Sequence, residues 1–304
     1  MNSNRRPAIS HQPSAISRIR TFLDMIRFEH TIFALPFAYL GMALAARGLP
    51  TLWQFIWITI AMAAARTAAM SLNRYIDRFI DSRNPRTAKR PIQAGRIGAN
   101  TVLAGAILSL VILAAAAWQL NPLVFILFPG AVVFLVGYSY TKRFTALCHF
   151  ILGFTDGLAP MGAWAAITGT VFARADLPAW LLLGVVTVWI GGFDILYALQ
   201  DAEVDRREGL HSLPAWLGIP TGLWIARLCH ALTVALLIAV GLVSALGWPY
   251  WIGVATVAGL LLYEHSLVTP TDLSKLNVAF FNVNGYISVT IFVATLVALL
   301  LVQG

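Results

Sequence analysis

The chain has 304 residues and a formal net charge of +8, and 59% of its residues are hydrophobic while only 11% are charged. Soluble domains contain on the order of 45–50% apolar and 25% charged residues, so this composition, with a mean hydropathy of +0.77, excludes an ordinary soluble protein. We expect one integral membrane domain over residues 1–304.

The N-terminal segment, residues 1–28, is basic and lacks the unbroken apolar centre and cleavage site of a signal peptide. Its apolar residues recur at helical spacing, opposite arginines, at Ile16, Ile19, Phe22, Leu23 and Ile26. This pattern is typical of an amphipathic helix that contacts membrane lipids on an anionic, cytoplasmic surface. The alternative is a frayed basic tail.

Long apolar runs follow, and none has the alternating pattern of a membrane β-barrel strand. A helix needs on the order of 20 residues to cross about 30 Å of hydrocarbon. The runs lie at about 29–47, 52–72, 101–119, 122–140, 149–169, 178–198, 221–246, 249–265 and 279–302. The predicted fold is therefore an all-α bundle of nine transmembrane helices. Gly153 and Gly157, four residues apart in the fifth run, predict close helix packing.

The loops between these runs differ strongly in charge. With a cytoplasmic N-terminus, nearly every Lys and Arg outside a run is cytoplasmic, and only Arg47 and Arg174 are not. Short basic loops stay in the cytoplasm, so we expect this orientation in a bacterial inner membrane, with an extracytoplasmic C-terminus. The net charge reflects topology, and no basic domain outside the membrane is present to bind a nucleic acid.

The few acidic residues are concentrated in two segments, each directly after an apolar run. Polar positions are four residues apart in both segments: Asn73, Asp77 and Asp81 in the first, and Tyr197, Asp201 and Asp205 in the second. At about 3.6 residues per turn, such positions share one helical face. Each segment therefore predicts a column of oxygen atoms at the cytoplasmic end of a span, and Asp194 adds one oxygen nearly a turn deeper.

Stacked carboxylates repel one another unless a cation compensates for their charge. Mg²⁺ prefers oxygen ligands and completes its shell with water and substrate phosphate, whereas the thiolate and imidazole clusters typical of zinc or copper are absent. The predicted magnesium ligands are Asn73, Asp77, Asp81, Asp194, Asp201 and Asp205. The alternative is that these residues are solvated helix ends at the membrane interface.

These motifs resemble those of the UbiA-type intramembrane prenyltransferases, which carry N-x-x-x-D-x-x-x-D after the second span and D-x-x-x-D after the sixth. The resemblance includes NPRTAKRP at 84–91 and a Y-x-x-x-K motif at Tyr138 and Lys142. Arg74 is a departure, because many relatives have an acid there, so the first column would hold its metal with fewer ligands. Within the family, the chain is most similar to bacterial 4-hydroxybenzoate polyprenyltransferase-like members.

The resemblance implies Mg²⁺-dependent transfer of a polyprenyl group from polyprenyl diphosphate to a ring carbon of a hydroxyaryl acid. The acceptor would be 4-hydroxybenzoate or a dihydroxynaphthoate, in ubiquinone or menaquinone biosynthesis. A central apolar chamber, capped by two cytoplasmic loops at 73–100 and 199–220, would keep water from the allylic cation. The alternatives are another lipid-quinone or porphyrin-type acceptor and, from a different class, a transporter or channel for cations or lipid phosphates.

Several polar residues acquire roles in this reaction. Asp77, Asp81, Asp201 and Asp205 would act in catalysis through the metal. Lys142, Arg86, Arg90 and His211 are predicted to bind the diphosphate, although a solvent-facing position is an equal alternative for His211. Tyr138 is predicted to stabilise the cation through its ring, with an interfacial aromatic belt as its alternative.

An acceptor site is predicted deeper in the membrane. Arg66 lies within the second run, where a lone Arg is costly, so it either binds an acceptor carboxylate or pairs with Asp156. Asp156, Tyr197 and Asn277 complete the predicted acceptor-binding residues. For Asp156 and Asn277 the alternative is hydrogen bonding between helices.

Overall fold

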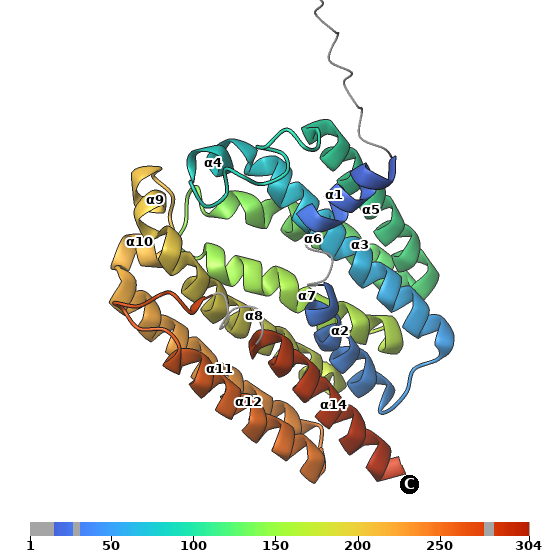
Figure 1. Cartoon of the computed structure of the whole chain (residues 1–304). Coiled ribbons are helices and arrows are strands. Elements are labelled where there is room, and N and C mark those ends of the chain that lie inside the picture. The colour runs from blue at the N-terminus through green and yellow to red at the C-terminus, as the bar shows by residue number, and fades with distance from the viewer. Residues whose placement is uncertain (1–14, 27–30, 277–282, 304) are drawn as a thin grey trace, which may run out of the picture.

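The computed structural model describes residues 15–26, 31–276 and 283–303. Within these ranges the chain forms helices joined by short loops, and no strand is present (Figure 1). The predicted all-α class is confirmed for this part of the chain. Asn277, predicted to bind the acceptor, lies outside the described residues, as do residues 1–14 of the N-terminal segment.

The helices follow one another along the chain with short connections. In order they are α1 (Ala15–Met25), α2 (Thr31–Ala46), α3 (Leu52–Ile76), α4 (Arg78–Arg83), α5 (Ala99–Leu120), α6 (Pro122–Thr141), α7 (Cys148–Thr168), α8 (Leu177–Ala198), α9 (Ala202–Arg207), α10 (Leu213–Leu217), α11 (Ile219–Val243), α12 (Trp248–Ser266) and α14 (Asn284–Gln303). Two short 3-10 helices, η2 (Arg174–Asp176) and η3 (Leu199–Asp201), flank α8.

Seven helical segments in the described ranges are long and apolar enough to cross a membrane. They contain α3, α5, α6, α7, α8, α11 and α14. The apolar stretch of α2 is shorter, at Leu35–Ala46, and α12 carries Glu264 and His265 near its end. The chain is thus a membrane-spanning bundle, while the count of nine spans stays a prediction.

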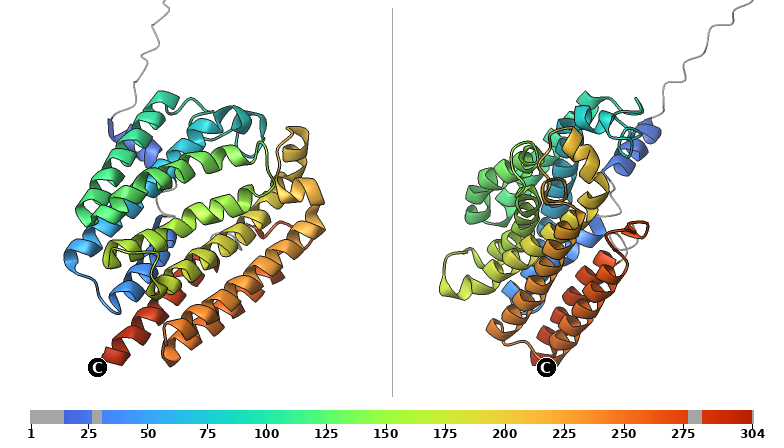
Figure 2. Two further views of the ribbon diagram at one scale, coloured as in Figure 1. Left: turned by 180° about the vertical axis from the view of Figure 1, so that it is seen from behind. Right: turned by 90° about the vertical axis from the view of Figure 1, so that its left-hand side faces the viewer.

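The central helices α7 and α8 pack backbone to backbone between α3, α5 and α6 on one side and α11 and α12 on the other (Figures 1 and 2). A Cβ atom added at Gly153 would lie 2.1 Å from the carbonyl oxygen of Thr187, and one at Gly157 would lie 2.9 Å from that of Leu183. Only glycine permits this approach. The packing predicted from the four-residue spacing of these glycines is confirmed.

Both acidic motifs lie at one end of the bundle, together with α4, α9 and α10 and opposite the C-terminal end of α14 (Figures 1 and 2). We call this the motif end. Asp77, with φ −86° and ψ 1°, ends α3 and turns the chain into α4. Similarly, η3 separates α8 from α9. The helix thus breaks within each motif, which was not predicted. Across the first break the four-residue steps persist, since Asp77 N–H donates to Asn73 O at 2.9 Å and Asp81 N–H donates to Asp77 O at 2.8 Å.

The N-terminal helix α1 packs across the same end of the molecule. Met25 and Ile26 are buried in a cluster with Ile97, from the loop after α4. The ring of Phe22 lies over α5 so closely that a Cβ atom at Gly105 would be 2.7 Å from it. The predicted helix is therefore present and uses these apolar residues to contact the protein, while its contact with lipids stays a prediction.

Candidate active site

A cavity of about 650 Å³ lies among α3, α6, α7 and α8. Its wall is mainly apolar, with large side chains such as Phe37, Phe134 and Trp189. Charged and polar residues also line it: Arg66, Arg74, Arg90, Tyr138, Thr155, Asp156, Asp194, Tyr197 and Asn284. Seven of these nine belong to the motifs or were predicted as site residues, so the cavity extends from the motif end into the helix bundle.

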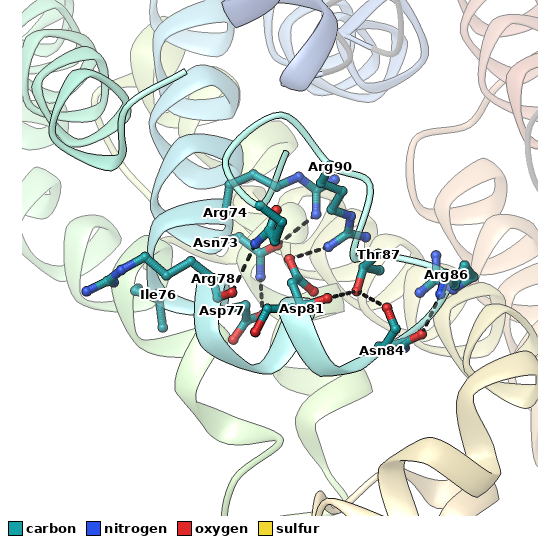
Figure 3. Close-up of polar contacts among 12 residues, drawn as sticks. Asn73, Arg74, Ile76, Asp77, Arg78, Asp81, Asn84, Arg86, Thr87 and Arg90 are labelled. Atoms are coloured by element: carbon teal, nitrogen blue, oxygen red, sulfur yellow. Dashed lines mark hydrogen bonds and ion pairs between the residues drawn. The ribbon is translucent and has the colours of Figure 1, made fainter. Parts of the chain in front are cut away.

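Asp77 is the buried centre of the first motif, with 2% of its surface exposed. Lys142 Nζ lies 2.6 Å from its Oδ2, and Arg143 Nη2 lies 3.4 Å from its Oδ1. Asn73 Nδ2 also donates a hydrogen bond to Oδ2, at 3.1 Å (Figure 3). A buried carboxylate requires such compensation, and here two cations that follow α6 provide it.

Asp81 is held by the basic loop that follows α4. Arg90 Nη1 lies 2.6 Å from Asp81 Oδ2, and Thr87 Oγ1 donates to the backbone oxygen of Asp81 at 2.8 Å. The loop thereby folds back over α4 (Figure 3). A predicted diphosphate-binding cation is thus bound to a predicted metal ligand.

Asp201, in the second motif, contacts the same loop. Arg86 Nε donates to Asp201 Oδ1 at 2.9 Å, and Arg86 Nη2 contacts Oδ2. Asn84 Nδ2 donates to the same Oδ1 at 3.0 Å, and Arg86 Nη1 donates to the Tyr197 hydroxyl at 2.9 Å. Burial alone would lower the pKa of the Arg86 guanidinium, but the hydrogen bonds to Asp201 and its charge raise that pKa. Arg86 therefore carries its positive charge in this pair.

These contacts join the two motifs, which lie on different spans. Asn84 was not predicted as a site residue, although it follows Asp81 by three residues, close to one helical turn, and begins the NPRTAKRP segment. That spacing could have identified Asn84 as a site residue from the sequence. Tyr197, predicted to bind the acceptor, lines the cavity, and its hydroxyl accepts a hydrogen bond from Arg86.

Asp194 lies on the cavity wall and is fixed by a histidine that the sequence did not single out. His149 Nδ1 lies 2.7 Å from Asp194 Oδ2, and His149 Nε2 accepts the backbone N–H of Leu213 at 3.2 Å. Because Nε2 accepts, Nδ1 carries the proton and donates to Asp194. The only signal in the sequence was a polar residue at the start of an apolar run.

The remaining predicted residues at the motif end differ in their positions. Asp205 interacts electrostatically with Asp201 and Lys142, which places it with the other acidic groups. His211 has an exposed side chain, and its backbone N–H donates to the carbonyl oxygen of Lys142 at 2.7 Å. The His211 contact with diphosphate stays a prediction.

Arg66 and Asp156 line the cavity on α3 and α7. Arg66 Nε is buried and has no hydrogen-bond partner among the described residues. Asp156 attracts Arg66 electrostatically, but no direct ion pair joins their side chains within the described ranges. Arg66 thus retains an N–H donor for another group.

Tyr138 donates its hydroxyl hydrogen to Ala69 O at 3.2 Å, which fixes its ring in the cavity wall.

The donor atoms at the motif end suit a hard cation. Among the described residues, no three His, Cys, Asp or Glu side chains are grouped closely enough to form a complete metal centre. Mg²⁺ does not need one, because it is usually bound by one or two carboxylates together with water and substrate phosphate. The carboxylate and amide oxygens present therefore fit a Mg²⁺ ion that is shared with a diphosphate.

Comparison with known proteins identifies relatives along most of the chain. Residues 34–286 match the model of the UbiA prenyltransferase family. The 4-hydroxybenzoate octaprenyltransferase of Nitrosospira multiformis is 33% identical over 253 residues, which is 83% of this chain and 85% of the relative.

Two solved structures are also similar. The apo structure of a UbiA homolog from Aeropyrum pernix is 32% identical, with a TM-score of 0.81 over 89% of this chain and 98% of that one. The structure of a UbiA homolog from Archaeoglobus fulgidus bound to GPP and Mg²⁺ is 19% identical, with a TM-score of 0.63 over 90% of this chain and 99% of that one. At that identity it shows a common fold.

Proposed function

Because the chain belongs to the UbiA prenyltransferase family, we propose that this prenyl-transferring membrane enzyme moves a polyprenyl group from polyprenyl diphosphate to a ring carbon of a hydroxyaryl acid. The acceptor is 4-hydroxybenzoate or a dihydroxynaphthoate, and the product is a precursor of ubiquinone or menaquinone. One observation carries the proposal: acidic and basic groups from two motifs meet beside an apolar cavity that has Arg90, Tyr197 and Arg66 in its wall.

The diphosphate binds at the motif end. Lys142, Arg86 and Arg90 supply hydrogen-bonding cations for its oxygens, with His211 as a further contact. A Mg²⁺ ion held by the ligands Asn73, Asp77, Asp81, Asp194, Asp201 and Asp205 would supply Lewis-acid stabilisation of the pyrophosphate leaving group. Within this set, Asp194 is also hydrogen-bonded to His149 Nδ1, at 2.7 Å.

The reaction breaks the allylic C–O bond of the donor, forms a C–C bond to the acceptor ring and releases the proton of that ring carbon. The apolar cavity wall keeps water away from the allylic cation and accommodates the prenyl chain. Tyr138, whose hydroxyl is bound to Ala69 O, presents its ring at the wall and stabilises the cation.

The acceptor lies in the same cavity, held by its carboxylate. A guanidinium gains most from a planar carboxylate, which accepts two parallel hydrogen bonds. The buried Nε of Arg66 has no other described partner, so it provides one of these bonds. Asp156, Tyr197 and Asn277 complete the acceptor side. The motif end faces the cytoplasm, together with the N-terminus.

The test is a product assay. Membranes that contain the wild-type protein are incubated with Mg²⁺, a radiolabelled polyprenyl diphosphate and either 4-hydroxybenzoate or a dihydroxynaphthoate, and the product is identified by mass spectrometry. We expect prenylation on the ring carbon beside a hydroxyl. Membranes with the Asp201→Asn variant provide the control. Label release without any prenylated aromatic product would contradict the proposal.

A further inference from the structure

The groups proposed to bind metal and the groups proposed to bind diphosphate are bound to each other. Three carboxylates of the metal set each contact one cation of the diphosphate set: Asp77 with Lys142, Asp81 with Arg90, and Asp201 with Arg86. The first two pairs have N···O distances of 2.6 Å. The pairing recurs, because it involves three of the six proposed metal ligands and three of the four proposed diphosphate-binding residues.

Each pair takes up part of the binding capacity of both sets. A carboxylate lone pair that accepts from an ammonium or guanidinium is not free for a metal ion, and the paired N–H is not free for a phosphate oxygen. A divalent ion placed beside these cations would also be repelled by them. Removing only Arg90 from buried Asp81 would leave an uncompensated charge, whereas Asp77 without Lys142 would keep Arg143 at 3.4 Å.

We propose that Lys142, Arg90 and Arg86 are placeholder counterions that neutralise the aspartates until metal and diphosphate arrive together. The cations then move from the carboxylates to phosphate oxygens, and the freed carboxylates bind the metal. This inference rests on the proposed function. Every charged group exchanges one partner of opposite sign for another, so no buried charge is left alone.

A consequence is that each ligand alone binds weakly. The metal alone must displace a cation that has no phosphate to receive it, and diphosphate alone must take a cation from an aspartate that has no metal. Together each ligand supplies the partner that the other displaces. The two ligands therefore bind cooperatively, and such coupling is reciprocal.

The pair formed by Arg86 and Asp201 is best suited to a test, since their side chains are 31% and 13% exposed and tolerate substitution better than the deeper pairs. Asn84 remains hydrogen-bonded to Asp201 when Arg86 is replaced. Arg83 provides a matched control. It pairs with Glu208 at 2.8 Å at the same end of the bundle, and Glu208 is not a proposed metal ligand.

The experiment measures Mg²⁺ binding by isothermal calorimetry in detergent, without any diphosphate. It compares the wild type with Arg86→Gln, Arg83→Gln and the double variant Arg86→Gln/Asp201→Asn, after thermal unfolding has shown that each is folded. Arg86→Gln should bind Mg²⁺ about tenfold more tightly than the wild type, within the usual range of coupling. Arg83→Gln should match the wild type, and the double variant should lose the gain.

A second variant and a second ligand test the same inference independently. Lys142→Gln should show a smaller gain through Asp77, because Arg143 stays 3.4 Å from that carboxylate. Inorganic pyrophosphate in the presence of EDTA should bind Arg86→Gln more weakly than the wild type. Equal Mg²⁺ affinity in the wild type and Arg86→Gln, or an equal gain in Arg83→Gln, would overturn the inference. Failure of the proposed function is a separate result, in which the wild type binds Mg²⁺ yet prenylates no hydroxyaryl acid.

Discussion

Arg86 donates a hydrogen bond from Nε to Oδ1 of Asp201 at 2.9 Å, although the two residues lie 115 positions apart in the sequence. Arg86 belongs to the loop after the first motif, and Asp201 belongs to the second. Their contact therefore fixes the relative position of the two halves of the proposed diphosphate site. It also joins the loop between α4 and α5 to the second motif.

The first prediction concerns the proposed metal ligands. Asp77→Asn and Asp201→Asn should each lower the prenyl-transfer rate by at least about 100-fold, because each removes a charge that holds the metal. Initial rates, normalised to the amount of protein in the membrane, provide the measurement. Glu208→Gln, at the same end but outside the proposed ligands, should keep near-normal activity. Near-normal turnover of either Asn variant at saturating Mg²⁺ would count against the two-motif site.

The second prediction concerns acceptor recognition by Arg66. Arg66→Lys should weaken use of the acceptor by about tenfold or more, because Lys keeps the charge and loses the planar fork. The Michaelis constant for the prenyl diphosphate should stay nearly unchanged. Steady-state kinetics with each substrate varied in turn separate these effects. A change confined to the donor would move Arg66 to the diphosphate site.

A comparison of acceptors tests the same contact from the substrate side. The wild type should prenylate 4-hydroxybenzoate or a dihydroxynaphthoate much faster than the corresponding phenols without a carboxylate. The loss of two charge-assisted hydrogen bonds is the physical reason. Equal wild-type rates on acids and phenols would exclude carboxylate recognition.

The third prediction concerns the packing of α7 on α8. Gly153→Ala should destabilise the protein by about 1–3 kcal/mol, the usual cost of overpacking, since its Cβ would lie 2.1 Å from the backbone oxygen of Thr187. Thermal unfolding in detergent measures the effect. Gly162→Ala on the same helix is the control, because nothing lies within 4 Å of its added Cβ. Equal midpoints for the two variants would show that this contact is not tight.

The fourth prediction concerns membrane topology. Nine spans and the distribution of Lys and Arg place the C-terminus outside the cytoplasm. A reporter enzyme that is active only outside the cytoplasm, fused after Gly304, should be active, whereas a fusion in the loop that contains Lys142 should be inactive. Activity of a cytoplasmic reporter at the C-terminus would refute the count of nine.

Local patterns in the sequence were sufficient for the fold class and for the motifs. The apolar runs predicted the helices, and the glycine spacing predicted the approach of α7 to α8, because both depend on residues close together in the chain. The breaks within the motifs were not predicted. Asp77 ends α3 because the chain turns into α4 at that residue, and a four-residue spacing is the same in a continuous and a broken helix.

Contacts between distant segments were the part that the sequence could not supply. His149 fixes Asp194 only because α7 and α8 pack side by side, and Asn84 contacts Asp201 only because the loop after α4 crosses to the second motif. The basic residues were predicted to bind diphosphate, yet in the structure Arg86, Arg90 and Lys142 are bound to aspartates. Charge alone does not distinguish these partners, and only the geometry does.

The most direct test of the central claim is the metal dependence of prenyl transfer by the purified wild-type protein. The transfer of a radiolabelled prenyl group to 4-hydroxybenzoate or a dihydroxynaphthoate is measured with Mg²⁺, after addition of excess EDTA, and again after Mg²⁺ is restored. The proposed site predicts that EDTA abolishes formation of the prenylated acid and that Mg²⁺ restores it. Undiminished transfer in EDTA would contradict the assignment of the aspartates as metal ligands.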